Sequence, residues 1–141
     1  MKYWDSSAVV PLLVTERETA SVRAILTKDT SVIVSVLTAV EVTSALWRRR
    51  RSSELDDGGF TLAETALSEL ERSWNVVLDV DQIQRRARRI LAVHALRAAD
   101  ALQLAGALIA CDERTALLPF VTLDTRLSAA ARREGFAVLP V

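Results

Sequence analysis

The chain has 141 residues, of which 50% are hydrophobic and 26% charged, enough for one compact domain but too short for two ordinary ones. Its 18 basic and 18 acidic residues cancel, which argues against a role in coating or packaging nucleic acid, because that binding needs a strong basic excess. One cysteine excludes an internal disulfide, and no signal peptide or membrane-length apolar stretch is visible, so we expect no membrane association and a cytoplasmic location.

The first half of the chain predicts strands that alternate with helices. The β-branched run Ser-Val-Ile-Val-Ser is typical of a short buried strand, and Pro11 fits near the first turn of a helix. Asp56, Asp57, Gly58 and Gly59 mark a loop. We expect a strand at 2–4, helices from about 7 and at 16–27, a strand at 31–35, a helix at 38–50, a loop at 51–61, a helix at 62–72 and a strand at 75–78.

The second half repeats this alternation. We expect an arginine-rich helix at 81–93, an alanine- and leucine-rich helix at 98–110, a strand at 119–123, a helix at 127–134 and a last strand at 136–139. Strands separated by helices imply right-handed crossovers and a mostly parallel sheet covered on both faces. The sequence therefore predicts a single α/β domain over residues 1–141, a three-layer α/β/α sandwich with its site at the carboxyl ends of the strands.

Four acidic residues fall at or near those strand ends. Asp5 and Asp124 each follow a predicted strand, where an aspartate can also simply cap the next helix. Glu41 follows Thr38 by three residues, which matches a capping box. Asp100 lies among small and apolar residues, so we expect it to be partly enclosed and to need a partner such as Arg97, backbone N–H groups or a metal ion.

Together the four acids indicate more than they do singly. If they converge, several like charges lie close together, and this arrangement is unfavourable unless a cation neutralises it. An all-oxygen ligand set suits Mg²⁺ or Mn²⁺ rather than zinc. Such a site activates water and stabilises the charge on a transferring phosphoryl group. The pattern thus predicts metal-assisted phosphodiester hydrolysis.

Other chemistries fit less well. The glycines are too scattered for a phosphate-binding loop, and the only lysines, Lys2 and Lys28, leave no lysine near the last strands for a receiver domain. No Gly-x-Ser-x-Gly elbow accompanies His94, so a hydrolase triad is disfavoured and His94 is interpreted as a residue that follows a helix. Trp47 and the other tryptophans are interpreted as core or interface anchors.

Four segments, in order along nearly the whole chain, carry a resemblance to a known family. They are Tyr-Trp-Asp-Ser-Ser-Ala at 3–8, Thr-Ala-Val-Glu-Val at 38–42, Leu-Arg-Ala-Ala-Asp-Ala-Leu-Gln-Leu-Ala at 96–105 and Phe-Val-Thr-Leu-Asp-Thr-Arg-Leu at 120–127. No single segment is decisive, but the ordered set is specific. In this set the chain resembles the PIN-domain ribonucleases, and specifically the VapC-type toxins of toxin–antitoxin pairs.

The resemblance implies that Asp5, Glu41, Asp100 and Asp124 form an acidic metal site, with Ser7 and Thr122 as supporting hydroxyls. It also implies dependence on Mg²⁺ or Mn²⁺, endonucleolytic cleavage of RNA, a homodimer and inhibition by a cognate antitoxin. Two alternatives stay open: a structure-specific DNA nuclease, and a non-catalytic PIN-like binding module. The two arginine clusters are expected to be mainly exposed helix faces, and candidates for holding flanking phosphates are Arg48, Arg49, Arg50, Arg51, Arg85 and Arg89.

Overall fold

The structure, a computed structural model, describes residues 1–140, and its centre is a five-stranded sheet of order β3-β2-β1-β4-β5. The strands are β1 (Lys2–Trp4), β2 (Val32–Ser35), β3 (Asn75–Val77), β4 (Phe120–Val121) and β5 (Val138–Leu139). Every neighbouring pair is parallel, which confirms the sheet type that the alternation predicted. The carboxyl ends of β1, β2 and β4 therefore lie at one edge of the sheet.

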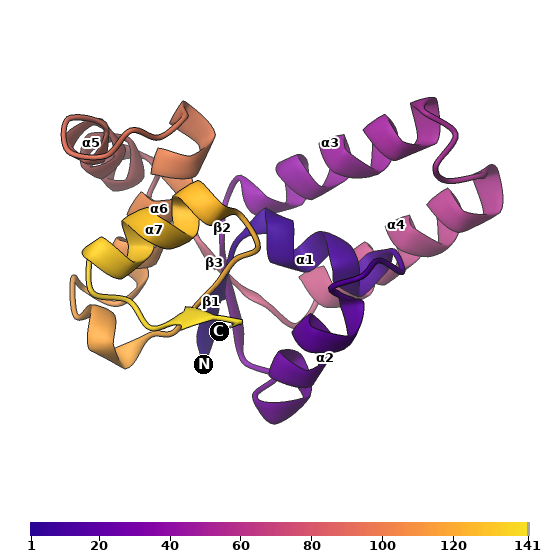
Figure 1. Cartoon of the computed structure of the whole chain (residues 1–141), viewed down its shortest axis with the longest axis horizontal. Coiled ribbons are helices and arrows are strands. Elements are labelled where there is room, and N and C mark those ends of the chain that lie inside the picture. The colour runs from indigo at the N-terminus through magenta and orange to yellow at the C-terminus, as the bar shows by residue number, and fades with distance from the viewer. Residues whose placement is uncertain (141) are drawn as a thin grey trace.

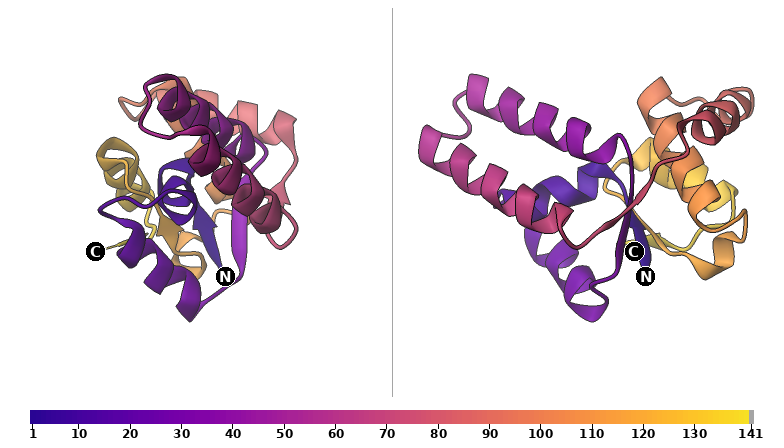
Figure 2. Two further views of the ribbon diagram at one scale, coloured as in Figure 1. Left: turned by 90° about the vertical axis from the view of Figure 1, so that its right-hand side faces the viewer. Right: turned by 180° about the vertical axis from the view of Figure 1, so that it is seen from behind.

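Helices cover both faces of this sheet, as Figure 1 shows. They are α1 (Ser6–Leu13), α2 (Thr19–Lys28), α3 (Thr38–Arg51), α4 (Asp57–Glu71), α5 (Val80–Leu91), α6 (Ala98–Ala110) and α7 (Thr125–Arg133), with a 3-10 turn at Thr115–Leu117. The first four helices lie on one face and the last three on the other, so the three-layer α/β/α prediction is confirmed. The pair α3 and α4 extends away from the sheet as a helical hairpin (Figure 2).

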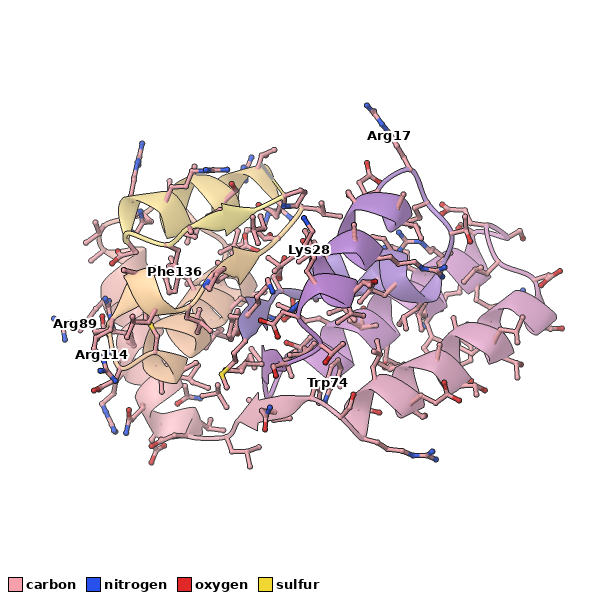
Figure 3. All side chains as sticks on the ribbon, turned by 90° about the horizontal axis from the view of Figure 1, so that it is seen from below. Arg17, Lys28, Trp74, Arg89, Arg114 and Phe136 are labelled. Atoms are coloured by element: carbon pink, nitrogen blue, oxygen red, sulfur yellow. The ribbon has the colours of Figure 1, made fainter. Side chains whose placement is uncertain are left out.

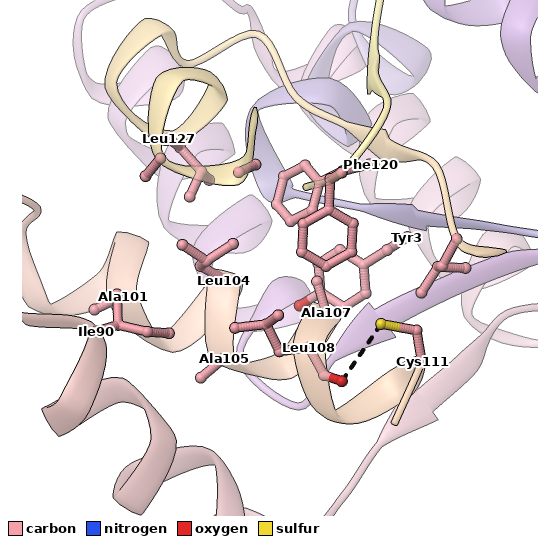
Figure 4. Packing of buried hydrophobic residues seen from close by; sticks show 14 of the residues in the cluster. Tyr3, Ile90, Ala101, Leu104, Ala105, Ala107, Leu108, Cys111, Phe120 and Leu127 are labelled. Carbon is pink, nitrogen blue, oxygen red and sulfur yellow. Dashed lines mark hydrogen bonds between the residues drawn. The ribbon is translucent and has the colours of Figure 1, made fainter. Parts of the chain in front are cut away.

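The pleat of the strands divides the core in two. Successive side chains on a strand point to opposite faces, so Tyr3 packs with the cluster under α5, α6 and α7, while Trp4 packs with the cluster under α1 to α4. Phe120 and Val121 on β4 divide in the same way. Figure 4 shows Tyr3 and Phe120 against α6, their ring centroids 5.2 Å apart. Position 5, next along the chain, leaves the sheet at its carboxyl edge.

The main departure from the expected elements is the segment predicted as a loop at 51–61. There, α4 already begins at Asp57 and contains Gly58 and Gly59, because the Asp56 carboxylate caps the helix by accepting a hydrogen bond of 2.7 Å from Gly59 N–H. The loop between α3 and α4 therefore comprises only residues 52–56. Pro11 also lies deeper than expected, in the second turn of α1. Among the described residues, no helix has the length and apolar character needed to cross a membrane.

Candidate active site

The carboxyl ends of β1 and β4 lie side by side, because Trp4 is in register with Val121. Asp5 follows the first strand and Thr122 follows the second, so residues more than a hundred positions apart come into contact. The Thr122 hydroxyl donates a hydrogen bond of 2.9 Å to Asp5 Oδ2. Sheet topology thus places one predicted hydroxyl directly on one predicted acid.

Asp5 is the most enclosed of the four acids, with 4% of its surface exposed. It caps α1 by accepting a hydrogen bond of 3.2 Å from Ser7 N–H, and the Ser7 hydroxyl also donates to it. Burial raises the pKa of Asp5, and the hydrogen bonds from Ser7 and Thr122 lower it again in part. The capping interpretation is therefore correct for Asp5, yet the cap alone leaves a buried carboxylate without a counter-charge.

Ser7 and Thr122 join α1 to the segment after β4. Their hydroxyl oxygens lie 3.2 Å apart, and Ser7 Oγ accepts a hydrogen bond of 2.9 Å from Leu123 N–H. Thr122 Oγ1 accepts one of 3.1 Å from Asp124 N–H. These contacts fix the start of α7, and with it Asp124, relative to Asp5.

Glu41 extends from the first turn of α3 and is half-buried. Its Oε1 accepts a hydrogen bond of 2.6 Å from Gln103 Nε2, and its Oε2 accepts one of 3.3 Å from Ser6, whose hydroxyl also lies 3.3 Å from Asp5 Oδ1. The side chain of Thr38 instead accepts from Ser35 N–H. Among residues 1–140, the Glu41 side chain makes no hydrogen bond to the backbone N–H of Thr38, so the capping-box interpretation of Glu41 is wrong.

Asp100 and Asp124 complete the edge from the opposite side. Asp100, in the first turn of α6, is half-buried, and burial raises its pKa first and the charge of Asp124 second, while the N–H of Arg97 opposes the shift. Asp124 caps α7 by accepting a hydrogen bond of 2.8 Å from Leu127 N–H. The partial enclosure expected for Asp100 is present, with Arg97 as one of its partners.

The four acids form an arc of like charges. Burial raises the pKa of Glu41 most, and the charges of Asp5 and Asp100 raise it further, as Asp124 does for Asp100. Within the described residues, none of the four makes an ion pair with a lysine, arginine or histidine. The negative charge at this edge is therefore not compensated by a cationic side chain in direct contact.

The arc is open rather than a closed cage. In the part of the chain that the structure describes, no three histidine, cysteine or acidic side chains lie close enough to enclose a metal ion. Mg²⁺ in proteins commonly keeps several waters and takes only one or two carboxylates, together with phosphate oxygens of a substrate. The all-oxygen arc suits that mode of binding and does not suit a zinc site, which takes three or four fixed protein ligands that are mostly cysteine and histidine.

An open groove of about 570 Å³ runs from the arc along α3. It is lined by Ser7 and Glu41 at one end and by Arg48 and Arg49 at the other. Arg48 is exposed and makes no ion pair with any residue from 1 to 140, whereas Arg49 pairs with Glu16. The groove therefore joins Glu41 of the arc to the guanidinium group of Arg48.

The other candidate arginines are placed less favourably. Arg50 pairs with Asp57, and the Arg51 guanidinium lies 6.0 Å from the centre of the Trp47 ring. Arg85 and Arg89 line a separate depression with Ile109, nine residues along α6 from Asp100, or about 13 Å at the rise of an α-helix. Figure 3 shows Arg89 at the outer edge of the molecule. The structure does not bring these two arginines to the acids.

His94 lies away from the acids, as the sequence indicated. It follows α5, is buried, and its Nε2 lies 2.7 Å from Glu134 Oε1. It has no hydrogen bond with the four acids among residues 1–140. A structural role in joining α5 to the end of α7 accounts for its position.

Comparison with known proteins identifies the family of the chain. The model of the PIN domain family matches residues 2–133. The chain belongs to the PIN domain family. Ribonuclease VapC45 of Mycobacterium tuberculosis is 30% identical to it over 145 residues, covering 98% of this chain and 94% of that protein.

Solved structures show the same PIN fold. The M. tuberculosis toxin VapC20, described as cleaving the sarcin–ricin loop, superposes with a TM-score of 0.71 at 20% identity, covering 99% of this chain and 100% of that one. A toxin–antitoxin complex from Klebsiella pneumoniae gives a TM-score of 0.66 at 19% identity, covering 99% of this chain and 97% of that one. At these identities the superpositions establish the fold.

Two residues that contact the acids of this candidate site were not singled out from the sequence. Ser6 bridges Asp5 and Glu41, and Gln103 is hydrogen-bonded to Glu41. The signal for Gln103 was present, because it is a polar residue in an apolar helix at the i+3 position from Asp100, on the same helical face. The sequence does not distinguish Ser6 from Ser7, since both serines suit the start of a helix.

Proposed function

We propose that the chain is a divalent-metal-dependent endoribonuclease, a VapC-type toxin that cleaves RNA in the cytoplasm and is restrained by a cognate antitoxin. The observation that carries this proposal is the buried Asp5 carboxylate, which is joined by Glu41, Asp100 and Asp124 in an arc with no cation in contact among residues 1–140. Its relatives support the reaction class, since VapC45 is named a ribonuclease and VapC20 a cleaving toxin.

Mg²⁺ or Mn²⁺ would be held by Asp5 and Asp100, with Glu41 and Asp124 binding directly or through water. When bound, the ion supplies a lowered pKa for an attacking water and stabilises charge on the scissile phosphate. Asp5 contributes a fixed carboxylate, because Ser7 and Thr122 hold Oδ2 in one orientation. Arg48 at the far end of the groove offers a contact for a flanking phosphate.

The test is cleavage of end-labelled RNA by the purified chain with Mg²⁺, with Mn²⁺ and with a chelator. We expect cleavage only when metal is present, and loss of at least 100-fold in rate for Asp5→Asn and Asp100→Asn, about the scale on which a transition-state charge stabiliser acts. Asp81→Asn, an exposed acid on α5, is the matched control and retains full activity. Full activity of both site variants contradicts the assignment.

Two further outcomes separate the alternatives. Faster cleavage of labelled DNA than of RNA under the same conditions favours a DNA nuclease. No cleavage of either polymer, together with equal growth inhibition by the wild type and Asp100→Asn in cells, favours a binding module without catalysis.

We also propose a homodimer and an antitoxin partner. Val40, Trp47 and Leu62 on the outward hairpin of α3 and α4 are 69%, 43% and 74% exposed, and exposed apolar side chains of this size favour an interface. The resemblance to a toxin–antitoxin complex supports the partner. Mass measurement by light scattering tests the dimer, and inhibition of RNA cleavage by the product of an adjacent gene tests the antitoxin.

A further inference from the structure

A chain of buried hydrogen bonds leads from the core to Glu41. The Tyr3 hydroxyl donates to Gln103 Oε1 at 2.8 Å, and Gln103 Nε2 donates to Glu41 Oε1 at 2.6 Å and contacts Thr38 Oγ1 at 3.2 Å. Tyr3 and Thr38 are fully buried and Gln103 is 1% exposed. Polar groups buried so deeply are costly unless each has a partner, and here each has one.

The chain of bonds has a fixed direction. If the Gln103 amide were rotated by half a turn, its oxygen would face the Glu41 carboxylate, and two acceptors would meet at 2.6 Å. In the observed orientation the tyrosine hydroxyl donates to the amide oxygen, which leaves the amide N–H groups for Thr38 and Glu41. The ionised Glu41 carboxylate, which can only accept, thus sets the orientation of the Gln103 amide, and the Tyr3 hydroxyl satisfies the amide oxygen on the other side.

Gly106 provides the space that this arrangement needs. A Cβ atom at position 106 would lie 2.7 Å from the Tyr3 hydroxyl oxygen, closer than real side chains allow. The tyrosine ring cannot move aside easily, because it is fully buried and packed against Phe120 (Figure 4). Glycine inside a helix is destabilising relative to alanine, so α6 carries an unfavourable residue where the tyrosine hydroxyl sits.

We infer that Gln103, held at its amide oxygen by Tyr3, is a positioning residue for metal binding that keeps the Glu41 carboxylate turned towards Asp5 and Asp100. The inference rests on the proposed function, because it gives Glu41 a part in the metal site. Partners that orient a ligand in this way typically contribute 10- to 100-fold in metal affinity. A residue that only satisfied a buried tyrosine would leave metal affinity unchanged.

The experiment measures Mn²⁺ affinity by calorimetric titration without RNA, alongside unfolding in denaturant without metal. The variants are Gln103→Met, which keeps the length of the side chain but removes the donor, and the double variant Tyr3→Phe/Gln103→Met, which leaves no orphaned hydroxyl. We expect both to bind Mn²⁺ about 10-fold more weakly. Gln84→Met on the exposed face of α5 is the control and binds as the wild type does.

A double-mutant cycle shows whether the effect passes through Glu41. In a Glu41→Gln background, adding Gln103→Met is expected to change Mn²⁺ affinity less than two-fold, because the carboxylate that it positions is already gone. An equally large loss in both backgrounds overturns the inference. So does wild-type Mn²⁺ affinity in Gln103→Met, whatever its stability.

The close approach of position 106 to the Tyr3 hydroxyl has a separate test. Gly106→Ala is expected to lower the denaturant midpoint in the wild-type background and to raise or leave it unchanged in Tyr3→Phe, because removal of the hydroxyl removes the close contact. Destabilisation of the same size in both backgrounds contradicts the close contact between position 106 and the Tyr3 hydroxyl.

A wild-type chain that neither binds Mn²⁺ nor cleaves RNA overturns the proposed function and this inference together. If Asp5→Asn abolishes both activities but Gln103→Met does not alter affinity, only the inference is overturned.

Discussion

Asp5 and Asp124 each combine two roles that are usually separate. Each carboxylate caps a helix, accepting an N–H of Ser7 or Leu127, and each also belongs to the acidic arc. A cap needs only an oxygen acceptor, and asparagine provides one, whereas metal binding needs the negative charge. The two roles can therefore be separated by substitution.

For Asp124 this gives a paired prediction. Asp124→Asn is expected to lose RNA cleavage while its free energy of unfolding stays close to that of the wild type. Asp124→Ala is expected to lose cleavage and also about 1 kcal/mol of stability, because the orphaned N–H of Leu127 loses its acceptor. Denaturant unfolding of both variants without metal checks it, and equal stability of the two contradicts the capping contribution.

Burial of like charges also predicts how stability depends on pH without metal. The pKa values of Asp5, Glu41 and Asp100 are raised above their ordinary values of 3.8, 4.5 and 3.8, chiefly by desolvation. The folded state then holds protons more tightly than the unfolded state, so these groups stabilise at low pH, and that contribution is lost as pH rises through the folded pKa values.

We therefore expect the unfolding free energy of the metal-free wild type, relative to that of Asp5→Asn, to fall from about pH 4 upward. The difference between the two proteins isolates Asp5 from other titrating groups, such as Asp29, whose pKa is lowered by the N-terminal ammonium group. Urea unfolding of both proteins at several pH values measures this difference in unfolding free energy. A difference that rises with pH means that Asp5 is stabilised as an anion by something other than metal.

At the scale of one element, α6 shows how an apolar helix serves a polar site. Its buried face packs on Tyr3, Phe120 and α5, while Asp100 and Gln103 lie one turn apart on the face that meets the sheet edge. The rigidity of a packed helix fixes the distance between these two side chains. From this one helix, Asp100 supplies a carboxylate of the acidic arc, and the Gln103 amide binds another member of the arc, Glu41.

The first turn of α4 gives a prediction of its own. A Cβ at Gly58 would meet only Asp56 Oδ1 at 3.7 Å, whereas at Gly59 it would lie 3.1 Å from the same oxygen and 3.4 Å from Leu55. Gly58→Ala is expected to raise the unfolding free energy by about 0.5 kcal/mol, through a less flexible unfolded chain and better helix propensity. Gly59→Ala is expected to gain less, because it crowds the helix cap. Thermal unfolding compares them, and a larger gain at Gly59 contradicts the argument.

At the scale of the whole molecule, the metal binding that we propose for the acidic edge would depend on folding. The arc exists only when β1, β2, β4 and α6 are assembled, so an ion that binds it stabilises the native state. At a Mg²⁺ concentration 100 times the dissociation constant we expect about 2.7 kcal/mol of added stability. Asp5→Asn is expected to gain much less. Sodium chloride at matched ionic strength is the control, since it screens the like charges of the arc without supplying a divalent ion.

The sequence alone determined much of the fold. Strands followed by helices are local patterns, so the parallel sheet and the start of α1 and α6 were predicted closely. The prediction of a loop at 51–61 was wrong in its second half. Glycines and aspartates favour a loop by composition, but the Asp56 cap allows α4 to begin among them. Local preferences indicate which elements form, and caps decide where they begin.

For the site, the sequence supplied the four acids and the hydroxyls of Ser7 and Thr122, and their catalytic roles stay predictions. Only the tertiary structure joined Tyr3 to Gln103 across 100 positions, left Arg48 free while Arg49 found Glu16, and kept Arg89 away from the arc. The reason is physical: charge and hydrogen-bonding capacity are properties of a residue, whereas its partners, its burial and its pKa depend on which distant segments fold against it.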